Sequence, residues 1–287
     1  MLYTSPQEWR DASQKRVAFF GMSGLGKTHI SKMLRATGDW FHYSVDYRIG
    51  TRYMGEHIVD NFKREAMQNP FLRDLMLQDS IYIASNISFE NLAPLSSYLG
   101  KPGDPAKGGI PFEEYVIRQR QHRVAEVKAT LDAILFADKA KNIYGYDHFV
   151  GDTSGSLCEV VDPSDPEDPV LKPMSQHILP VWLKGTQDHI DTLAERFNRS
   201  PKPMYYKEDF LRKTWAEYCA EHGQSENSVD PDDFIRWGYR QLLHHRMPLY
   251  RAIAENWGVT LEASDIAQAQ TADEVSELIA QAITDKG

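Results

Sequence analysis

A glycine-rich stretch between two apolar segments constrains the fold of this 287-residue chain more than any other feature. Residues 21–28, GMSGLGKT, follow the apolar run RVAFF and begin KTHISKMLRATG, whose pattern is that of a helix ending at Gly38. Glycines allow the backbone angles that turn successive N–H groups toward one point, and a helix start adds the positive end of its dipole. The sequence therefore predicts a strand over 16–20, an anion-enclosing loop and a helix.

A second apolar run sets the class of fold. Residues 40–44, WFHYS, are predicted to form a strand, and strand, helix and strand in this span imply a parallel sheet with a right-handed crossover. Further strands are predicted at 148–150, 178–184 and 259–262. We therefore expect an α/β protein.

The middle of the chain has a helical pattern. The clearest helix is predicted for 112–141, where apolar residues recur at helical spacing: Val116, Val124, Val127, Leu131, Ile134 and Leu135. The same helix carries a basic cluster that we expect to be a solvated face, with a substrate-facing cluster as the alternative: Arg118, Arg120, His122 and Arg123. Before it lies a glycine- and proline-rich loop, 100–109, predicted to lack regular structure. We expect a core of residues 1–64 and 146–287 that carries a helical insertion of residues 65–145.

Composition and charge exclude several classes of protein. The chain has 32 Lys and Arg against 41 Asp and Glu, a net charge of −9, which argues against nucleic-acid or anionic-membrane binding through bulk electrostatics. Cys158 and Cys219 lie far apart, which disfavours a disulfide scaffold and fits a reducing compartment. No apolar run approaches the ~20 residues that span a bilayer, and the N-terminus lacks the apolar core of a secretory signal. A cytoplasmic protein is expected.

The glycine loop fits the pattern GxxxxGK[ST] in full, with a strand before it and a helix after it. In this pattern the lysine neutralises the β- and γ-phosphates of a nucleotide and the next hydroxyl binds Mg²⁺, so Lys27 and Thr28 are assigned these roles. The sequence thus predicts ATP and Mg²⁺ as ligands. The residues expected to contact the nucleotide are Gly21, Met22, Ser23, Gly24, Leu25, Gly26, Lys27 and Thr28.

A second polar group follows the predicted strand at 148–150. Asp152 stands where an acid at the C-terminal end of a core strand can bind Mg²⁺ or its waters, although Asp is also common in turns and helix caps. The next residues, Thr-Ser-Gly-Ser, offer backbone and hydroxyl groups to a substrate, with Gly155 as the predicted contact. The alternative for these residues is a simple turn.

Further along the chain, HYSVD places Asp46 after the second strand, a helix ends in Arg196 and Arg199, and RMPLYR begins at Arg246. In this order the motifs resemble the shikimate-kinase-like group of P-loop kinases, which share the nucleoside-monophosphate-kinase fold. The resemblance implies a three-layer P-loop fold with a parallel five-stranded sheet in the order 2-3-1-4-5. It also implies that Asp46 binds the phosphate acceptor, that the two helix-end arginines approach the phosphates from a lid, and that Arg246 binds an acidic group of the acceptor.

The chain also departs from that group. Shikimate kinases carry Asp-x-Asp after the second strand and three glycines after the third, where this chain has SVD and TSGS. Their Phe-Arg-x-x-Glu acceptor motif has only a blurred counterpart in FKRE, and the insertion of residues 65–145 has no counterpart. Shikimate is therefore rejected as the presumed substrate, because the donor half of the pattern is preserved and the acceptor half is rebuilt.

The predicted acceptor and lid residues have alternative interpretations. Asp46 fits a general base for an acceptor hydroxyl as well as a cap or a surface ion pair. Arg196 and Arg199 fit a bidentate phosphate clamp as well as solvated arginines at a helix C-terminus. Arg246 fits an anion pocket as well as one turn of an exposed helix.

Together these observations predict an ATP- and Mg²⁺-dependent phosphotransferase that acts on a small anionic molecule. Lys27, the loop amides and Mg²⁺ would hold the triphosphate, a lid arginine, Arg199 ahead of Arg196, would close over it, and Asp46 or Asp152 would orient the acceptor hydroxyl. Two alternatives stay open: a nucleotide kinase, and a regulatory ATPase whose insertion binds a protein partner.

Overall fold

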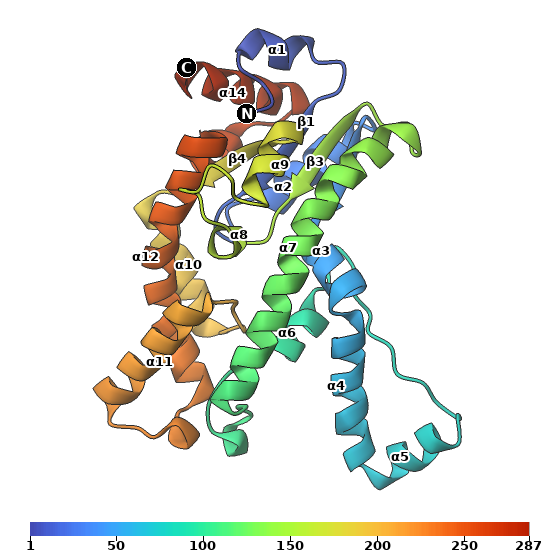
Figure 1. Cartoon of the computed structure of the whole chain (residues 1–287), viewed down its shortest axis with the longest axis vertical. Coiled ribbons are helices and arrows are strands. Elements are labelled where there is room, and N and C mark those ends of the chain that lie inside the picture. Colours follow the sequence, from blue (N-terminus) through green and yellow to red (C-terminus); the bar gives the residue numbers. More distant parts are fainter. Residues whose placement is uncertain (287) are drawn as a thin grey trace. The chain divides into compact units, whose positions relative to one another are not determined.

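The computed structural model describes residues 1–286, and it contains a sheet of five parallel strands (Figure 1). The strands run in the order β2-β3-β1-β4-β5, which confirms the predicted fold class. Their bounds are Arg16–Phe20 (β1), Trp40–Ser44 (β2), His148–Asp152 (β3), Leu179–Lys184 (β4) and Val259–Glu262 (β5). β1 lies between β3 and β4, with Phe19 opposite Asp152 on one side and Val181 on the other.

The strands form at short apolar runs because the centre of the sheet is covered on both faces. Val17, Ala18, Phe19 and Phe20 of β1 are each at most 1% exposed, and β3 and β4 are buried along almost their whole length. Strands buried on both faces have continuous apolar sequences rather than alternating ones. This burial explains why short apolar runs in the sequence predict these strands.

The chain divides into two compact units. The sheet unit comprises Met1–Val45, Glu126–Pro201 and Arg236–Gly287, and the helical unit comprises Asp46–Ala125 and Lys202–Ile235. These bounds do not coincide with the expected core and insertion. Residues 126–145 belong to the sheet unit because their helix packs on it, as where the Tyr43 hydroxyl donates to the Ala129 carbonyl at 2.6 Å. The functional division into a core and an acceptor region stays a prediction.

The sheet unit carries its own set of helices. They are α1 (Pro6–Asp11), α2 (Lys27–Ala36), α8 (Leu157–Val160), α9 (Leu171–His177), α10 (Gln187–Arg199), α13 (Ala263–Gln268) and α14 (Ala272–Lys286), with the second half of α7 (Phe112–Asn142) and most of α12 (Pro231–Trp257). Helices α1 and α14, from opposite ends of the chain, lie side by side (Figure 1). There the buried Trp9 indole donates to the Ser276 carbonyl at 2.9 Å.

The helical unit is built around aromatic side chains. The Phe112 ring stacks on Trp215 at 4.8 Å between centroids, and Phe234 meets Trp215 edge-on at 4.7 Å. The short helix α3 (Val45–Arg48) leads into this unit. The unit contains the π-helix η1 (Ile49–Tyr53), α4 (Gly55–Gln68), α5 (Pro70–Leu77), α6 (Ala93–Leu99), the 3₁₀ turns η2 (Pro105–Lys107) and η3 (Glu226–Ser228), α11 (Glu208–His222) and the first half of α7.

Among the helices of residues 1–286, none is long and apolar enough to cross a membrane.

The basic cluster on α7 holds helices of this unit together. The Arg118 side chain is buried, donates from Nε to Glu114 at 2.9 Å and lies over the Tyr98 ring at 4.9 Å. Arg120 makes two 2.6 Å hydrogen bonds to the Glu208 carboxylate. The prediction of a solvated face is therefore wrong for Arg118 and His122, which are both buried within the unit.

The loop at 100–109 is more ordered than predicted. It contains η2, and Pro102 forms an isolated bridge with Ile110. The Asp104 N–H donates to the Val229 carbonyl at 2.8 Å, and a Cβ at Gly103 would lie 2.5 Å from that same oxygen. The loop owes its order to a segment more than 100 positions away, which local sequence does not reveal.

Candidate functional site

The loop between β1 and α2 has the backbone shape that its glycines predict. Gly21, Gly24 and Gly26 have φ angles of 126°, 92° and 97°, in the left-handed region that favours glycine. A Cβ at Gly21 would also lie 2.8 Å from the Leu183 carbonyl oxygen, and one at Gly24 would lie 2.6 Å from the Leu193 side chain. The glycines therefore both shape the loop and let it fit against its neighbours.

Lys27 begins α2 and reaches back to the start of the loop. Its side chain is buried, and the ammonium donates to the carbonyls of Gly21 at 2.8 Å and Met22 at 2.9 Å. Burial penalises a charge unless polar partners surround it. These carbonyls stabilise the ammonium at the base of the glycine loop.

Thr28 and Asp152 form a polar pair beside the loop. The Thr28 hydroxyl donates to Oδ2 of Asp152 at 2.7 Å, and Asp152 ends β3, the neighbour of β1. Burial raises the pKa of the Asp152 carboxyl above 3.8, while the Lys27 charge and the Thr28 hydrogen bond act in the opposite direction. A hydroxyl and a carboxylate side by side are the oxygen ligands that Mg²⁺ takes.

The turn after β3 packs against the loop. Thr153 donates to the Phe19 carbonyl from both its N–H and its hydroxyl, each at 3.1 Å. A Cβ on Gly155 would lie 2.7 Å from the Ser23 hydroxyl oxygen, so glycine permits the approach without displacing Ser23. The turn is therefore a fixed neighbour of the loop, and the role of Gly155 as a substrate contact stays a prediction.

Glu126, on α7, forms hydrogen bonds with the same turn and was not predicted from the sequence. Its fully buried carboxylate accepts hydrogen bonds from the hydroxyls of Ser154 and Ser156, the second at 2.7 Å. Ser154 also accepts from the Ser156 N–H at 3.2 Å. The available signal was a helix face of small, buried side chains: Ala129, Ala133 and Ala137. A carboxylate on such a face is removed from water and needs donors.

Arg246, on α12, is a second buried charge at this turn. Its Nε donates to Oε1 of Glu159 at 2.5 Å, and its Nη1 donates to the Gly155 carbonyl at 3.0 Å. The Tyr250 hydroxyl donates to the same carbonyl. Burial disfavours the charge of the guanidinium, but Glu159, Tyr250 and Cys158 together act in the opposite direction and hold the pKa of Arg246 well above its ordinary value. Arg246 thus already pairs with an acid of the protein, and its role toward an acceptor stays a prediction.

The predicted acceptor acid lies on α3, and the predicted lid arginines lie on α10. Asp46 is half-buried and follows two residues after Ser44, which is opposite Asp152 in the β2–β3 register. Arg196 and Arg199 are exposed in the last turn of α10. Within residues 1–286 neither arginine side chain forms a hydrogen bond or an ion pair.

No protein-family profile matches the chain, and no curated protein matches it either. Among solved structures, the chain is similar to a crystal structure of shikimate kinase from Bacteroides thetaiotaomicron, with 13% sequence identity and a TM-score of 0.38. The alignment covers 92% of this chain and 95% of that one. A similarity of this size carries no argument for a shared activity.

Proposed function

We propose that the chain is an ATP- and Mg²⁺-dependent phosphotransferase that acts on a small, anionic acceptor. The supporting observation is a glycine loop with a buried Lys27 at its base and the Thr28–Asp152 pair beside it, 2.7 Å between their oxygens. A triphosphate requires N–H donors and a cationic side chain, and its metal ion requires oxygen ligands. The loop N–H groups, Lys27 and the Thr28–Asp152 pair would supply these groups.

The residues of the loop fit a triphosphate with Mg²⁺. A Cβ at Gly26 would meet no atom within 4 Å, so open space adjoins the loop at the start of α2. Lys27 and the loop N–H groups would hold the phosphates, and Thr28 and Asp152 would hold the ion, with phosphate oxygens and water as its other ligands. Such a site needs no cluster of three His, Cys, Asp or Glu side chains, and none able to hold a metal occurs within residues 1–286. The bound ion would neutralise charge on the transferring phosphoryl group.

Other residues are proposed for the acceptor and for closure over the phosphates. Arg196 and Arg199 are exposed and without partners within residues 1–286, which leaves both guanidinium groups able to pair with phosphate oxygens. Asp46 is proposed to accept the proton of the acceptor hydroxyl. Gly155 and Arg246 are proposed to lie on the acceptor side of the turn after β3.

Replacing Lys27 with alanine tests the proposal. Loss of the ammonium should lower ATP turnover about 100-fold or more, because a charge-assisted contact of ~1.5–3 kcal/mol disappears and the transition state loses further stabilisation. Calorimetry measures ATP binding, and ADP formation measures turnover with and without an added fraction of small metabolites. Lys32→Ala, an exposed lysine of the same helix, is the matched control. Full turnover by a folded Lys27→Ala variant would reject this site.

One observation favours a regulatory ATPase with a protein partner as the second candidate. Helix α5 buries none of its side chains, and Phe71 and Leu77 are each 70% exposed, with Tyr82 beyond it 90% exposed. Large apolar side chains left exposed along one segment favour binding to another protein. A slow ATP hydrolysis that no small metabolite accelerates would support this candidate over the phosphotransferase.

A further inference from the structure

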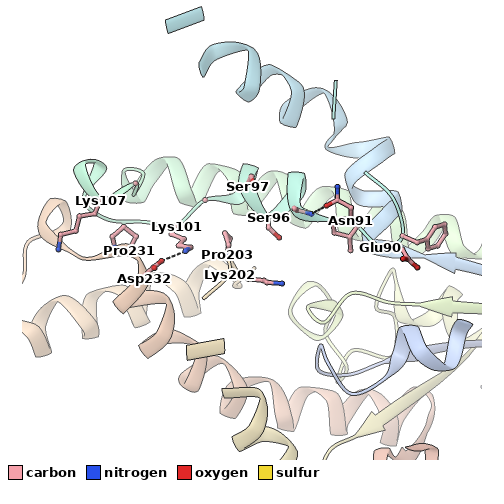
Figure 2. A pocket seen from close by; sticks show the side chains of 15 residues that line it. Glu90, Asn91, Ser96, Ser97, Lys101, Lys107, Lys202, Pro203, Pro231 and Asp232 are labelled. Atoms are coloured by element: carbon pink, nitrogen blue, oxygen red, sulfur yellow. Dashed lines mark hydrogen bonds and ion pairs between the residues drawn. The ribbon is translucent and has the colours of Figure 1, made fainter. Parts of the chain in front are cut away.

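A pocket of about 690 Å³ lies wholly within the helical unit (Figure 2). Two stretches line it: residues 89–108, and residues 202–203 with 231–232. The volume lies within the range of about 300–1,000 Å³ that is usual for small-molecule sites. None of the residues predicted for nucleotide, metal or acceptor binding lines this pocket, so it calls for an explanation of its own.

The walls of the pocket are joined by contacts that need no ligand. Lys101 forms an ion pair with Asp232 at 2.5 Å, and Lys107 forms one with Asp230 at 3.1 Å. A backbone hydrogen bond from Asp104 ties the same two stretches together. The pocket is therefore preformed, which reduces the entropy that a ligand would lose on binding.

Several polar groups in the pocket have bonding capacity left over. The hydroxyls of Ser96 and Ser97 and the ammonium of Lys202 make no hydrogen bond or ion pair within residues 1–286. Lys101 directs one of its three N–H donors to Asp232. Figure 2 shows Ser96, Lys101 and Lys202 around the same hollow. Ammonium groups and hydroxyls that converge in this way suit a negatively charged group with hydroxyl neighbours.

The pocket has more lysines than acids in its lining, although the whole protein is acidic. The chain has a net charge of −9, whereas three lysines line the pocket against two acids, Glu90 and Asp232, with Asp230 paired to Lys107 from outside the lining. Positive charge in a concave surface concentrates anions there. A lysine ammonium is a compact point charge, so it pairs with a carboxylate or a phosphate without requiring one geometry.

We propose that this pocket binds a small organic anion that carries a carboxylate or a phosphate next to hydroxyl groups. Lys202 and Lys101 pair with the anionic group, and Ser96 and Ser97 form hydrogen bonds with the hydroxyls. Leu92 and two prolines of the lining, Pro203 and Pro231, supply apolar surface for the carbon skeleton. None of the residues proposed for the phosphate acceptor lines this pocket, so the anion is not assigned as the acceptor and its binding does not rest on the proposed function.

Amide NMR of the full chain tests the proposal. The ¹⁵N-labelled protein is titrated at low ionic strength with citrate, with glycerol 3-phosphate and with neutral glycerol. We expect saturable shifts of the non-proline amides of residues 89–108, of Lys202 and of Asp232 with at least one anion and none with glycerol, and the two anions distinguish a carboxylate from a phosphate ligand. Lys202→Glu should weaken this binding ~10-fold or more, because it replaces a charge-assisted contact with repulsion. Lys213→Glu, at a lysine 73% exposed outside the pocket in the same unit, should leave the binding unchanged.

Two results would overturn the proposal. One is that both anions shift these amides no more than glycerol does, and the other is that Lys202→Glu binds them as tightly as the unmodified chain. A parallel titration with a non-hydrolysable ATP analogue, followed at residues 21–28, separates this outcome from the proposed function. Anion binding without nucleotide binding refutes the phosphotransferase alone, and nucleotide binding without anion binding refutes the pocket alone.

Discussion

Arg246 in the sheet unit and Arg212 in the helical unit both pair with glutamates, but water reaches only the second network. The side chains of Arg246 and Glu159 are 5% and 0% exposed. Those of Arg212 and its partners Glu113 and Glu208 are 38%, 66% and 31% exposed. The same contrast holds for the two candidate sites, since Lys27 and Asp152 are buried whereas the lysines of the pocket are exposed or half-buried.

This difference in exposure determines whether a substitution changes stability as well as binding. Breaking a buried ion pair leaves an unpaired charge without water around it, whereas an exposed pair is screened and contributes little to stability. Substitutions around Asp152 should therefore change stability and nucleotide binding together. The charges of the pocket can be altered with little effect on the fold, and four predictions test this contrast.

Arg246→Ala should have the largest effect on stability. The free energy of unfolding should fall by about 3–5 kcal/mol, because Glu159 would lose the cation that faces it in a buried position. Urea unfolding followed by tryptophan fluorescence measures the change. The double variant Arg246→Ala/Glu159→Gln should recover part of the loss, since an amide needs no cation. A single variant as stable as the unmodified protein would contradict the buried pairing.

Asp152→Asn should weaken Mg²⁺-dependent nucleotide binding about 10–100-fold, as expected from losing one charged contact of ~1.5–3 kcal/mol. The pH dependence of nucleotide binding gives a second test of the Asp152 carboxylate. Burial raises the pKa of Asp152 above 3.8. As the pH is lowered, nucleotide binding to the unmodified protein should therefore begin to weaken at a higher pH than it would with an ordinary aspartate. Calorimetric titrations across a pH series measure both effects, with exposed Asp188→Asn as the control. A variant with an unchanged pH profile would remove Asp152 from the proposed metal site.

His42→Gln should make the protein less sensitive to acid. Burial, aided by the charges of Arg35 and Lys32, lowers the pKa of His42 to about 4. Between pH 6.5 and 4 the unfolded chain then binds a proton that the folded protein does not, so stability is lost as the pH falls through this window. The unmodified protein should lose about 2 kcal/mol more than the variant between pH 7 and pH 5. Urea unfolding at both pH values checks this, and the exposed His29→Gln should behave like the unmodified protein.

Arg212→Ala should have the smallest effect. Hydrogen bonds from Arg120 and Arg212 lower the pKa of Glu208 to about 2, but water and salt screen these partly exposed groups. The free energy of unfolding should fall by less than about 1 kcal/mol. A loss as large as that of Arg246→Ala, measured in the same urea titration, would erase the contrast between the two units.

The sequence predicted the parts of the molecule that local pattern controls. The ranges 16–20, 40–44 and 259–262 coincide with β1, β2 and β5, and the helix after the glycine loop begins at Lys27 as expected. The glycines at 21, 24 and 26 have positive φ because their pattern encodes a backbone shape rather than a distant contact. Such features depend on only a few neighbouring residues and can therefore be predicted from the local sequence.

The rest of the site depends on partners far away in sequence. Glu126 bonds serines 28 and 30 residues away, and Glu159 bonds an arginine 87 residues away. The alanine face of α7 is a signal that Glu126 is buried, but it does not reveal the distant partners of either acid, and neither acid was predicted. The order of the loop at 100–109 has the same origin, since its partner is Val229.

The strand order has a consequence for the chain while it is being synthesised. β1 needs β3 on one side and β4 on the other, but β4 begins only at Leu179, long after β1 ends at Phe20. At a synthesis rate of ~5–20 residues per second this interval lasts roughly 8–30 s. During that time one edge of an apolar strand has no native neighbour, and such an edge is a template for pairing with another chain. The surroundings of the glycine loop are therefore completed late, and the nascent chain should need temporary cover over β1 until β4 has been made.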